Sequence, residues 1–340
     1  MQQSTGAAVF HRHIDDLLGD SNTRYFGAGF RQVSHRIHDV KVDTGTRSAT
    51  ALVDIRYPAE WSKKRNRDLK PHLSTLDAMT VAAELADLYL RHAYGLEDAD
   101  ASRSWIRRAV MKASSTPTTD LGRVPASIEV ERTEASPEAM CGTLSHLACV
   151  AGSMAVDLIV DHPVVEARNR SAAYDQMDDA LGSADRRHYT SGYKSTAIDL
   201  SEVSSDAVDH ASATMTLQPS TRREAASGLS ADYEPFASMM YALTAAAQMS
   251  QVVLYGYDQL SRETSNNMWL RRLSMEMPRP VRIERPFLIQ TALTKTSVLP
   301  MKASRWRSAS FSTSFPGIQM EYNLAHELTA KSPDSPEKSQ

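Results

Sequence analysis

The sequence predicts an α+β protein with two related halves, each an antiparallel β-sheet wrapped around one long helix. Two observations lead to this prediction. The first is an internal repeat, and the second is a long apolar helix that lies between strand-like segments in each half. The chain has 340 residues, which is enough for two domains of ordinary size.

The repeat is anchored by two tryptophans in near-identical tetrads. Trp105 opens WIRR and Trp269 opens WLRR, and the two positions differ by 269 − 105 = 164. The segment SAT at 48–50 recurs at 212–214 with the same offset. Two longer matches shift the offset by only one residue: RYFGAGF with RHYTSGY, and GSMAVDLIV with GIQMEYNLA. Matches that keep their order over this distance indicate duplication of a domain-sized unit.

The first half reads as two strands, a helix and further strands. FRQVSHRIHDVKVD and TRSATALVDIRYP are rich in β-branched residues and partly alternate apolar with polar positions, as strands do. Apolar residues then recur at helical spacing, which predicts a helix over about 74–94 that is buried on most sides. Its anchors are Leu76, Met79, Ala83, Ala86 and Leu90. The segments from WIRRAVMKAS to AVDLIVDHP supply three or more strands.

The second half repeats this plan, with a helix predicted over about 235–255 between strand-like segments. We therefore expect a first unit over 24–163 and a second over 185–328. Residues 1–23 form an N-terminal segment, and the charged stretch 164–184 is expected to be a linker or a surface helix. The polar, Pro- and Ser-rich tail 329–340 is expected to be disordered.

A sheet that curls around a central helix from the same chain is the hotdog arrangement. The fold class predicted is therefore a tandem double hotdog. A single unit would leave a sheet edge unpaired and a groove open beside its helix. Two units paired edge to edge remove the free edge and create clefts between them. WIRR and WLRR are expected to open equivalent strands just after each helix.

Composition and motifs exclude several classes of function. The net charge is −3, and no basic face with interleaved aromatic residues is present, so we expect no nucleic-acid partner. No P-loop, GxGxxG or metal-ligand spacing occurs, which predicts neither a cofactor nor a metal site. No signal peptide or membrane-spanning stretch is visible, so a cytoplasmic protein is expected; it could form an oligomer.

The start of the first helix is the candidate catalytic site. Hotdog enzymes that act on acyl thioesters resemble one another in placing a carboxylate there, with a histidine nearby. The matching segment, LKPHLSTLDAM, holds His72, Ser74 and Asp77. His72 suits proton transfer near neutral pH, and Asp77 could be a base or could orient the histidine. The alternative is that Asp77 only caps the helix and that His72 is a loop residue.

Other candidates lie in the second half and in a basic loop. The segment SADYEPFASMM stands where the first half has its His/Asp pair, which is therefore not duplicated. Asp232, Tyr233 and Glu234 are candidate substrate-binding residues, or simply polar residues that precede a helix. Lys63 and Lys64 could bind a phosphate, or could belong to a solvated loop.

Two segments carry a family resemblance. YPAEWSKKRNRDLKPHLSTLDAM, together with the earlier RYFGAGFRQVSHRIHDVKVD, resembles the bacterial avirulence protein D (AvrD) family, and the likeness extends over about 24–325. It implies an enzyme of secondary metabolism that makes syringolide-type acyl glycosides, in which a β-ketoacyl chain is joined to a pentulose such as xylulose. The chain is also similar to the A-factor-type γ-butyrolactone synthases, although it lacks their usual Gly followed by Glu at the helix start.

These expectations together predict an enzyme that condenses a β-ketoacyl thioester with a small ketose or polyol. The thioester could be carried by an acyl carrier protein or by CoA. Two other classes stay open. One is a hotdog dehydratase or thioesterase acting on acyl carriers, and the other is a non-catalytic acyl-binding or effector-type protein. A cleft with His72 and Asp77 turned to solvent would favour binding alone.

Overall fold

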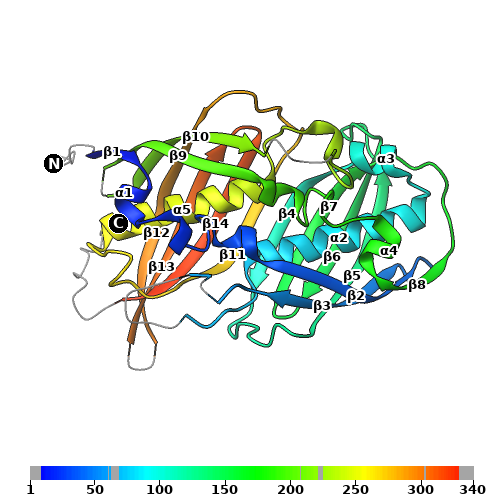
Figure 1. Cartoon of the computed structure of the whole chain (residues 1–340), viewed down its shortest axis with the longest axis horizontal. Helices are drawn as coiled ribbons and strands as arrows, with labels where there is room; N and C mark the ends of the chain where they lie inside the picture. The colour runs from blue at the N-terminus through cyan, green and yellow to red at the C-terminus, as the bar shows by residue number, and fades with distance from the viewer. Residues whose placement is uncertain are drawn as a thin grey trace.

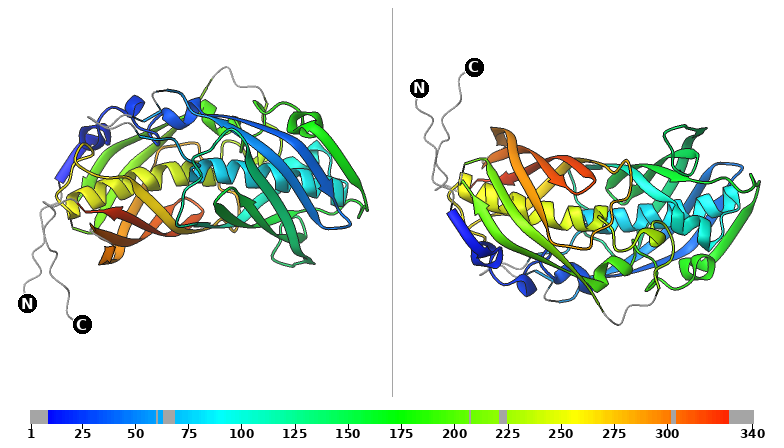
Figure 2. Two further views of the ribbon diagram at one scale, coloured as in Figure 1. Left: turned by 90° about the horizontal axis from the view of Figure 1, so that it is seen from below. Right: turned by 90° about the horizontal axis from the view of Figure 1, so that it is seen from above.

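A computed structural model describes residues 9–59, 61–62, 69–206, 208–220, 225–301 and 304–328. Fourteen strands form one continuous sheet, and each strand pair in it is antiparallel. The sheet curls around two long helices, α2 (Thr75–Tyr94) and α5 (Met239–Tyr257), which lie end to end along the long axis of the molecule (Figures 1 and 2). The prediction of a double hotdog is confirmed.

The first half contributes six strands around α2, in the spatial order β4-β7-β6-β5-β3-β2. Their bounds are β2 Ser34–Asp43, β3 Ser48–Arg56, β4 Trp105–Ala113, β5 Val124–Ala135, β6 Thr143–Ala151 and β7 Met154–His162. The short helix α3 (Asp98–Arg103) connects α2 to β4.

The second half repeats this order around α5, as β11-β14-β13-β12-β10-β9. Its strands are β9 Thr196–Ser205, β10 His210–Pro219, β11 Met268–Glu276, β12 Phe287–Met301, β13 Ser304–Phe315 and β14 Ile318–Glu327. The two halves therefore have the same strand topology.

The halves join where β4 pairs with β11 in antiparallel fashion, with Met111 opposite Leu273. Trp105 is the first residue of β4 and Trp269 the second of β11, so the tetrads open equivalent strands, as predicted. The environments of the two tryptophans differ. Trp105 is fully buried, whereas Trp269 is half-buried beside a cavity.

The two outer edges of the sheet are strands from outside the repeated units. β1 (Val9–His13) pairs with β9, and β8 (Ser171–Gln176) pairs with β2. β8 and the short helix α4 (Met177–Leu181) lie within 164–184, where the sequence predicted a linker or a surface helix. The tail 329–340 lies outside the described residues.

Both long helices are buried because the sheet surrounds them. Every residue of α2 from Leu76 to Leu90 is buried, which explains why its sequence is apolar on most sides. Gly95 ends α2 with φ 65°, a left-handed conformation that favours glycine. α5 begins at Met239 rather than near 235, because Phe236 and Ala237 pair with the backbone of 281–282 and Ser238 is the N-cap residue.

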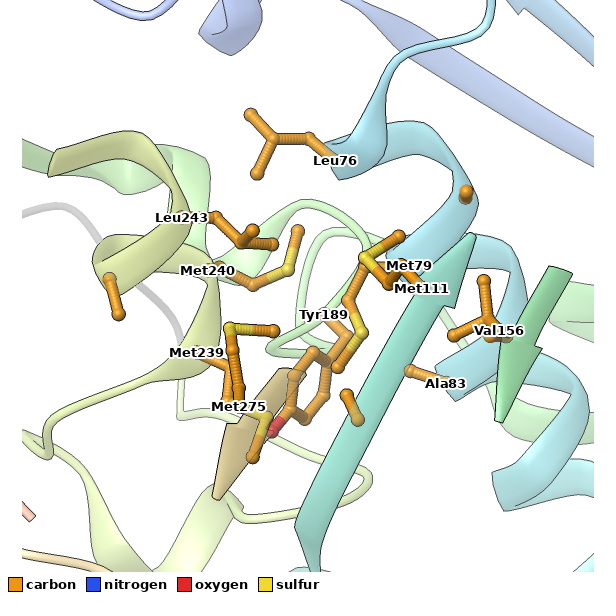
Figure 3. Packing of buried hydrophobic residues seen from close by; sticks show 14 of the residues in the cluster. Leu76, Met79, Ala83, Met111, Val156, Tyr189, Met239, Met240, Leu243 and Met275 are labelled. Carbon is orange, nitrogen blue, oxygen red and sulfur yellow. The ribbon is translucent and has the colours of Figure 1, made fainter. Parts of the chain in front are cut away.

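The first turns of α2 and α5 meet at the centre of the molecule. Figure 3 shows Leu76 and Met79 of α2 beside Met240 and Leu243 of α5, with Met111 and Met275 from the joining strands close by. Methionine is flexible enough to fill the irregular space where two helix ends meet. The helix starts, where the candidate site lies, are therefore held at the boundary between the halves.

Candidate active site at the start of the first central helix

Ser74 and Asp77 form a capping box at the start of α2. The Asp77 backbone N–H donates to Ser74 Oγ (3.2 Å), and the Ser74 backbone N–H donates to the Asp77 carboxylate (2.8 Å). This reciprocal pair satisfies two N–H groups that have no acceptor within the helix. Asp77 thus caps the helix, which is one of the roles considered from the sequence.

Asp77 also joins a buried hydrogen-bond network. His35 on β2 donates from Nε2 to the carboxylate (2.7 Å), and the hydroxyls of Tyr57 and Ser74 donate to it as well. Burial alone would raise the pKa of Asp77, but the hydrogen bonds from His35, Tyr57 and the Ser74 backbone lower it. The carboxylate is therefore ionised at neutral pH, although it is only 1% exposed.

Lys194 extends the network from the second half. It is a residue of the short 3-10 helix η3 (Gly192–Ser195), and its Nζ donates to the Val33 carbonyl (2.8 Å) and to His35 Nδ1 (3.3 Å). Burial lowers the pKa of His35, so its ring is neutral, with Nδ1 as the acceptor and Nε2–H as the donor. Burial also lowers the pKa of Lys194 to about 8.

Tyr25 connects this network to a cavity. The Ser74 hydroxyl gives its hydrogen to Asp77, so the Tyr25 hydroxyl donates to Ser74 Oγ (2.6 Å). The Tyr25 and Tyr57 rings stack with centroids 5.7 Å apart. Tyr25, Tyr57 and Ser74 line the cavity, whereas Asp77 lies behind them and does not. The hydroxyls of these three residues therefore connect the cavity to the carboxylate.

His72 is not paired with Asp77. Its ring lies 4.8 Å from the ring of Trp269, and its Nδ1 is 3.3 Å from the Lys70 carbonyl oxygen. Burial lowers the pKa of His72. The histidine that Asp77 orients is His35, so the structure does not bring His72 and Asp77 together as the sequence suggested.

Two cavities open at the helix start, with volumes of about 170 Å³ and about 600 Å³. We call the smaller one the first cavity and the larger one the second cavity. They share five lining residues: His72, Ser74, Thr75, Met268 and Leu270. The apolar wall of the first cavity comes from both halves. The second half supplies Leu243, Ala246, Leu273, Met320 and Leu324, and the first half supplies Phe26, Trp61 and Leu69. His72 and Ser74 are partly exposed, and both line the two cavities.

The second half holds a different network at the equivalent place. Ser238, the N-cap residue of α5, is 2.7 Å from His188 Nε2, and Glu234 is 2.5 Å from His188 Nδ1. Tyr233 donates to the Arg103 carbonyl (2.8 Å) and packs edge-on against Trp105. Asp232, Tyr233 and Glu234 flank the start of α5 and line neither cavity. Lys63 and Lys64 lie outside the described residues.

The described residues contain no group of three or more His, Cys, Asp or Glu side chains that could hold a metal ion. Among the helices in the described ranges, none is both long enough and apolar enough to cross a membrane.

Solved structures with a similar arrangement include thioesterases and a dehydratase-like protein. A tesB protein of Mycobacterium avium subs paratuberculosis matches with a TM-score of 0.40 and 12% identity, over 83% of this chain and 94% of that one. The 12:0-ACP thioesterase of Umbellularia californica matches with a TM-score of 0.35 and 11% identity, over 78% of this chain and 94% of that one. A MaoC domain protein of Chloroflexus aurantiacus matches with a TM-score of 0.38 and 7% identity, over 76% of this chain and 82% of that one.

The family comparison covers nearly the whole chain. No curated protein matches it in sequence. The family model described as Pseudomonas avirulence D protein (AvrD) matches residues 9–329, which include both halves of the repeat and the complete network around Asp77. The chain therefore belongs to the AvrD family.

Proposed function

We propose that this protein condenses a β-ketoacyl thioester with a hydroxyl of a small ketose or polyol, giving syringolide- or butenolide-type products. The observation that carries the proposal is the geometry at the start of α2. There a neutral histidine, a hydroxyl network that ends in an ionised carboxylate, and an apolar wall all border one cavity. Membership of the AvrD family supports it.

The apolar wall of the first cavity suits the acyl chain, and the helix start suits the thioester. Thr75, the first residue of α2, lines both cavities, and N–H groups in the first helical turn have no acceptor within the helix. Such N–H groups, with the helix dipole, stabilise an oxyanion that develops on the thioester carbonyl.

His72 is the proposed general base. Its ring is neutral at pH 7 and lines both cavities, so it can accept the proton of the attacking hydroxyl. The hydroxyl oxygen then bonds to the acyl carbon, the C–S bond breaks, and the proton passes to the leaving thiolate. A following aldol attack of the acyl α-carbon on the ketone would close the ring. That step needs only a modest base, because two carbonyls flank the carbon.

The direct test is incubation of the purified protein with a β-ketoacyl thioester and xylulose, followed by mass spectrometry. An adduct that contains both the acyl chain and the ketose is expected, and heat-inactivated protein is the control. If the only product is the free β-keto acid or an enoyl thioester, the protein is a thioesterase or a dehydratase instead. If the thioester binds and is recovered unchanged, the protein binds acyl groups without catalysis.

The pH dependence of kcat/KM should reflect the protonation of His72. A base with a lowered pKa is active above that pKa, so kcat/KM should stay level through pH 7 and fall only below His72's ordinary value of 6.5. Rates measured from about pH 5 to about pH 9 give the profile, and His72→Gln should remove the acid limb. An acid limb centred above 6.5 in the wild type would contradict this assignment.

A further inference from the structure

One buried lysine reaches from the second half into the network around Asp77. Lys194 is 9% exposed, whereas the other lysines in the described ranges are exposed: Lys41, Lys70, Lys112 and Lys295. Burial of an ammonium is unfavourable unless hydrogen bonds and charges compensate for it. Lys194 Nζ donates to the Val33 carbonyl (2.8 Å) and to His35 Nδ1 (3.3 Å). It also lies 5.7 Å from the centroid of the Tyr193 ring. The ammonium is therefore held beside a histidine of the other half.

The contact with Lys194 limits the protonation of His35. An ammonium donates hydrogen bonds and accepts none, so Nδ1 of His35 has to accept and cannot carry a proton of its own. The other ring nitrogen, Nε2, donates to the Asp77 carboxylate (2.7 Å). The side chains of His35 and Asp77 are each 1% exposed, so solvent screens their interaction very little. Without the lysine, the carboxylate would favour a protonated, positively charged ring.

The duplication shows that the buried lysine accompanies the histidine that it contacts. The offset that relates RYFGAGF to RHYTSGY makes Arg31 the counterpart of Lys194 (194 − 31 = 163). It also makes Ile198 the counterpart of His35 (198 − 35 = 163). Arg31 is exposed, and its Nε donates to the Lys194 carbonyl (2.7 Å). Where the repeat has an isoleucine in place of the histidine, the corresponding cation thus stays at the surface.

We propose that Lys194 is a positioning residue for the reaction at the start of α2, because it keeps His35 neutral and leaves the charge of Asp77 to the hydroxyl network. This deepens the proposed function, on which it rests, by adding a residue of the second half to the site. A protonated His35 would form an ion pair with the carboxylate and weaken its hold on the Ser74 hydroxyl, which lines the first cavity. The second half thus completes the site of the first.

The other ionisable groups near this pair carry no positive charge that could replace Lys194. Among the charges that act on His35, Lys194 is the positive one and Asp77 the negative one. The groups that act on Lys194, face its ring contact or bond to the same carboxylate network are acidic or phenolic: Asp77, Asp185, Glu84, Tyr25, Tyr57 and Tyr193. Burial raises the pKa of all three tyrosines, so they stay neutral.

Histidine side-chain NMR of the Lys194→Met variant tests the inference without turnover. Methionine is similar in length and removes the charge. In the wild type, burial and Lys194 lower the pKa of His35 below the ordinary 6.5 although Asp77 opposes them, so the ring should be neutral with its proton on Nε2. In the variant the positive charge is gone and the carboxylate remains, so His35 should titrate at a higher pH. His35→Gln assigns the signal. Arg31→Met is the control, because it removes a hydrogen bond to the Lys194 backbone but keeps the ammonium, and it should leave the titration unchanged.

The pH dependence of kcat separates a positioning role from a structural one. Lys194→Met should lower kcat about tenfold at about pH 6, where a protonated His35 pairs with the carboxylate. At about pH 9 the His35 ring is neutral in both proteins. Lys194 has then also lost its charge, because burial lowers its pKa to about 8, so the two rates should converge. An equal loss at each pH would be a structural defect and overturns the positioning role.

Two NMR results would also overturn the inference. One is the same His35 titration in the wild type and in folded Lys194→Met protein. The other is a proton on His35 Nδ1 in the wild type at neutral pH, a result that needs no variant and so decides the question even if Lys194→Met fails to fold. A raised His35 titration in the variant, with no condensation product from the wild type, rejects only the proposed reaction and leaves the control of His35 by Lys194 in place.

Discussion

Asp77→Asn is expected to lower kcat by about 10²-fold, the low end of the loss seen when a proton-transfer group itself is removed. Asp77 does not line the cavity, so it acts through Ser74 and Tyr25 as a positioning residue. An amide cannot accept all the hydrogen bonds that the carboxylate accepts, and its NH₂ group would face donors. We therefore also expect a loss of about 1–3 kcal/mol in the free energy of unfolding. Steady-state kinetics and thermal unfolding measure the two effects.

Tyr57→Phe provides the matched control for Asp77→Asn. This substitution removes one hydrogen bond to the Asp77 carboxylate. The carboxylate keeps its charge and its hydrogen bond from Ser74. The loss of kcat should be clearly smaller than for Asp77→Asn, and the acid limb of the pH profile should stay where it is. Equal rates for the wild type and folded Asp77→Asn protein would show that the carboxylate serves only as a helix cap.

Asp258→Ala is expected to reduce the free energy of unfolding by about 3–5 kcal/mol, because it leaves a buried arginine without its counter-ion. Asp258 follows the last turn of α5. Its two carboxylate oxygens share the hydrogen bond from Arg307 Nε–H (2.8 Å each), one of them accepts a second from Arg307 Nη2 (2.5 Å), and the carboxylate lies 3.0 Å from His326 Nε2. All three side chains are at most 1% exposed. Chemical denaturation of the wild type and the variant measures the difference.

The contribution of Asp258 to the free energy of unfolding should also depend on pH. Burial would raise its pKa, but the hydrogen bonds and charges of His326 and Arg307 lower it below the ordinary 3.8. The stabilisation is therefore fully present above pH 3.8 and is lost as the pH falls through the lowered pKa. Glu284→Ala is the control. It breaks an exposed ion pair with Arg282 and should change stability by no more than about 1 kcal/mol. A similar loss in both variants would contradict the expected role of burial.

The sequence was sufficient to predict the fold, because duplication leaves matched landmarks that can be read without coordinates. Trp105 and Trp269 identified the paired strands, and helical spacing predicted α2 to within a residue. The strands β1 and β8 were not predicted as parts of the sheet. Each is short, and each pairs with a strand far away in sequence.

The candidate site was only half predictable. Ser74 and Asp77 stand three residues apart, at the spacing of a capping box, so local sequence pointed to them. The rest of the network is distant in sequence: His35, the partner of Asp77, precedes it by 42 residues, and Lys194, which contacts His35, belongs to the other half. His35 was visible as a strand residue, but its partner is set by the way the sheet closes over α2. Proximity in sequence wrongly suggested His72 as that partner.

The join between β4 and β11 lies within a single polypeptide, and this has an evolutionary consequence. In an assembly of two identical chains, a substitution in one pocket is also present in the equivalent pocket of the other chain. Here Glu84 and Gln248 occupy matching places (248 − 84 = 164) and differ: Glu84 forms an ion pair with Arg187, whereas Gln248 accepts a hydrogen bond from Arg24. Because the two copies lie in one chain, each can change without the other, and Trp105 and Trp269 already differ in burial. Dilution, which would dissociate two separate chains, cannot part these halves.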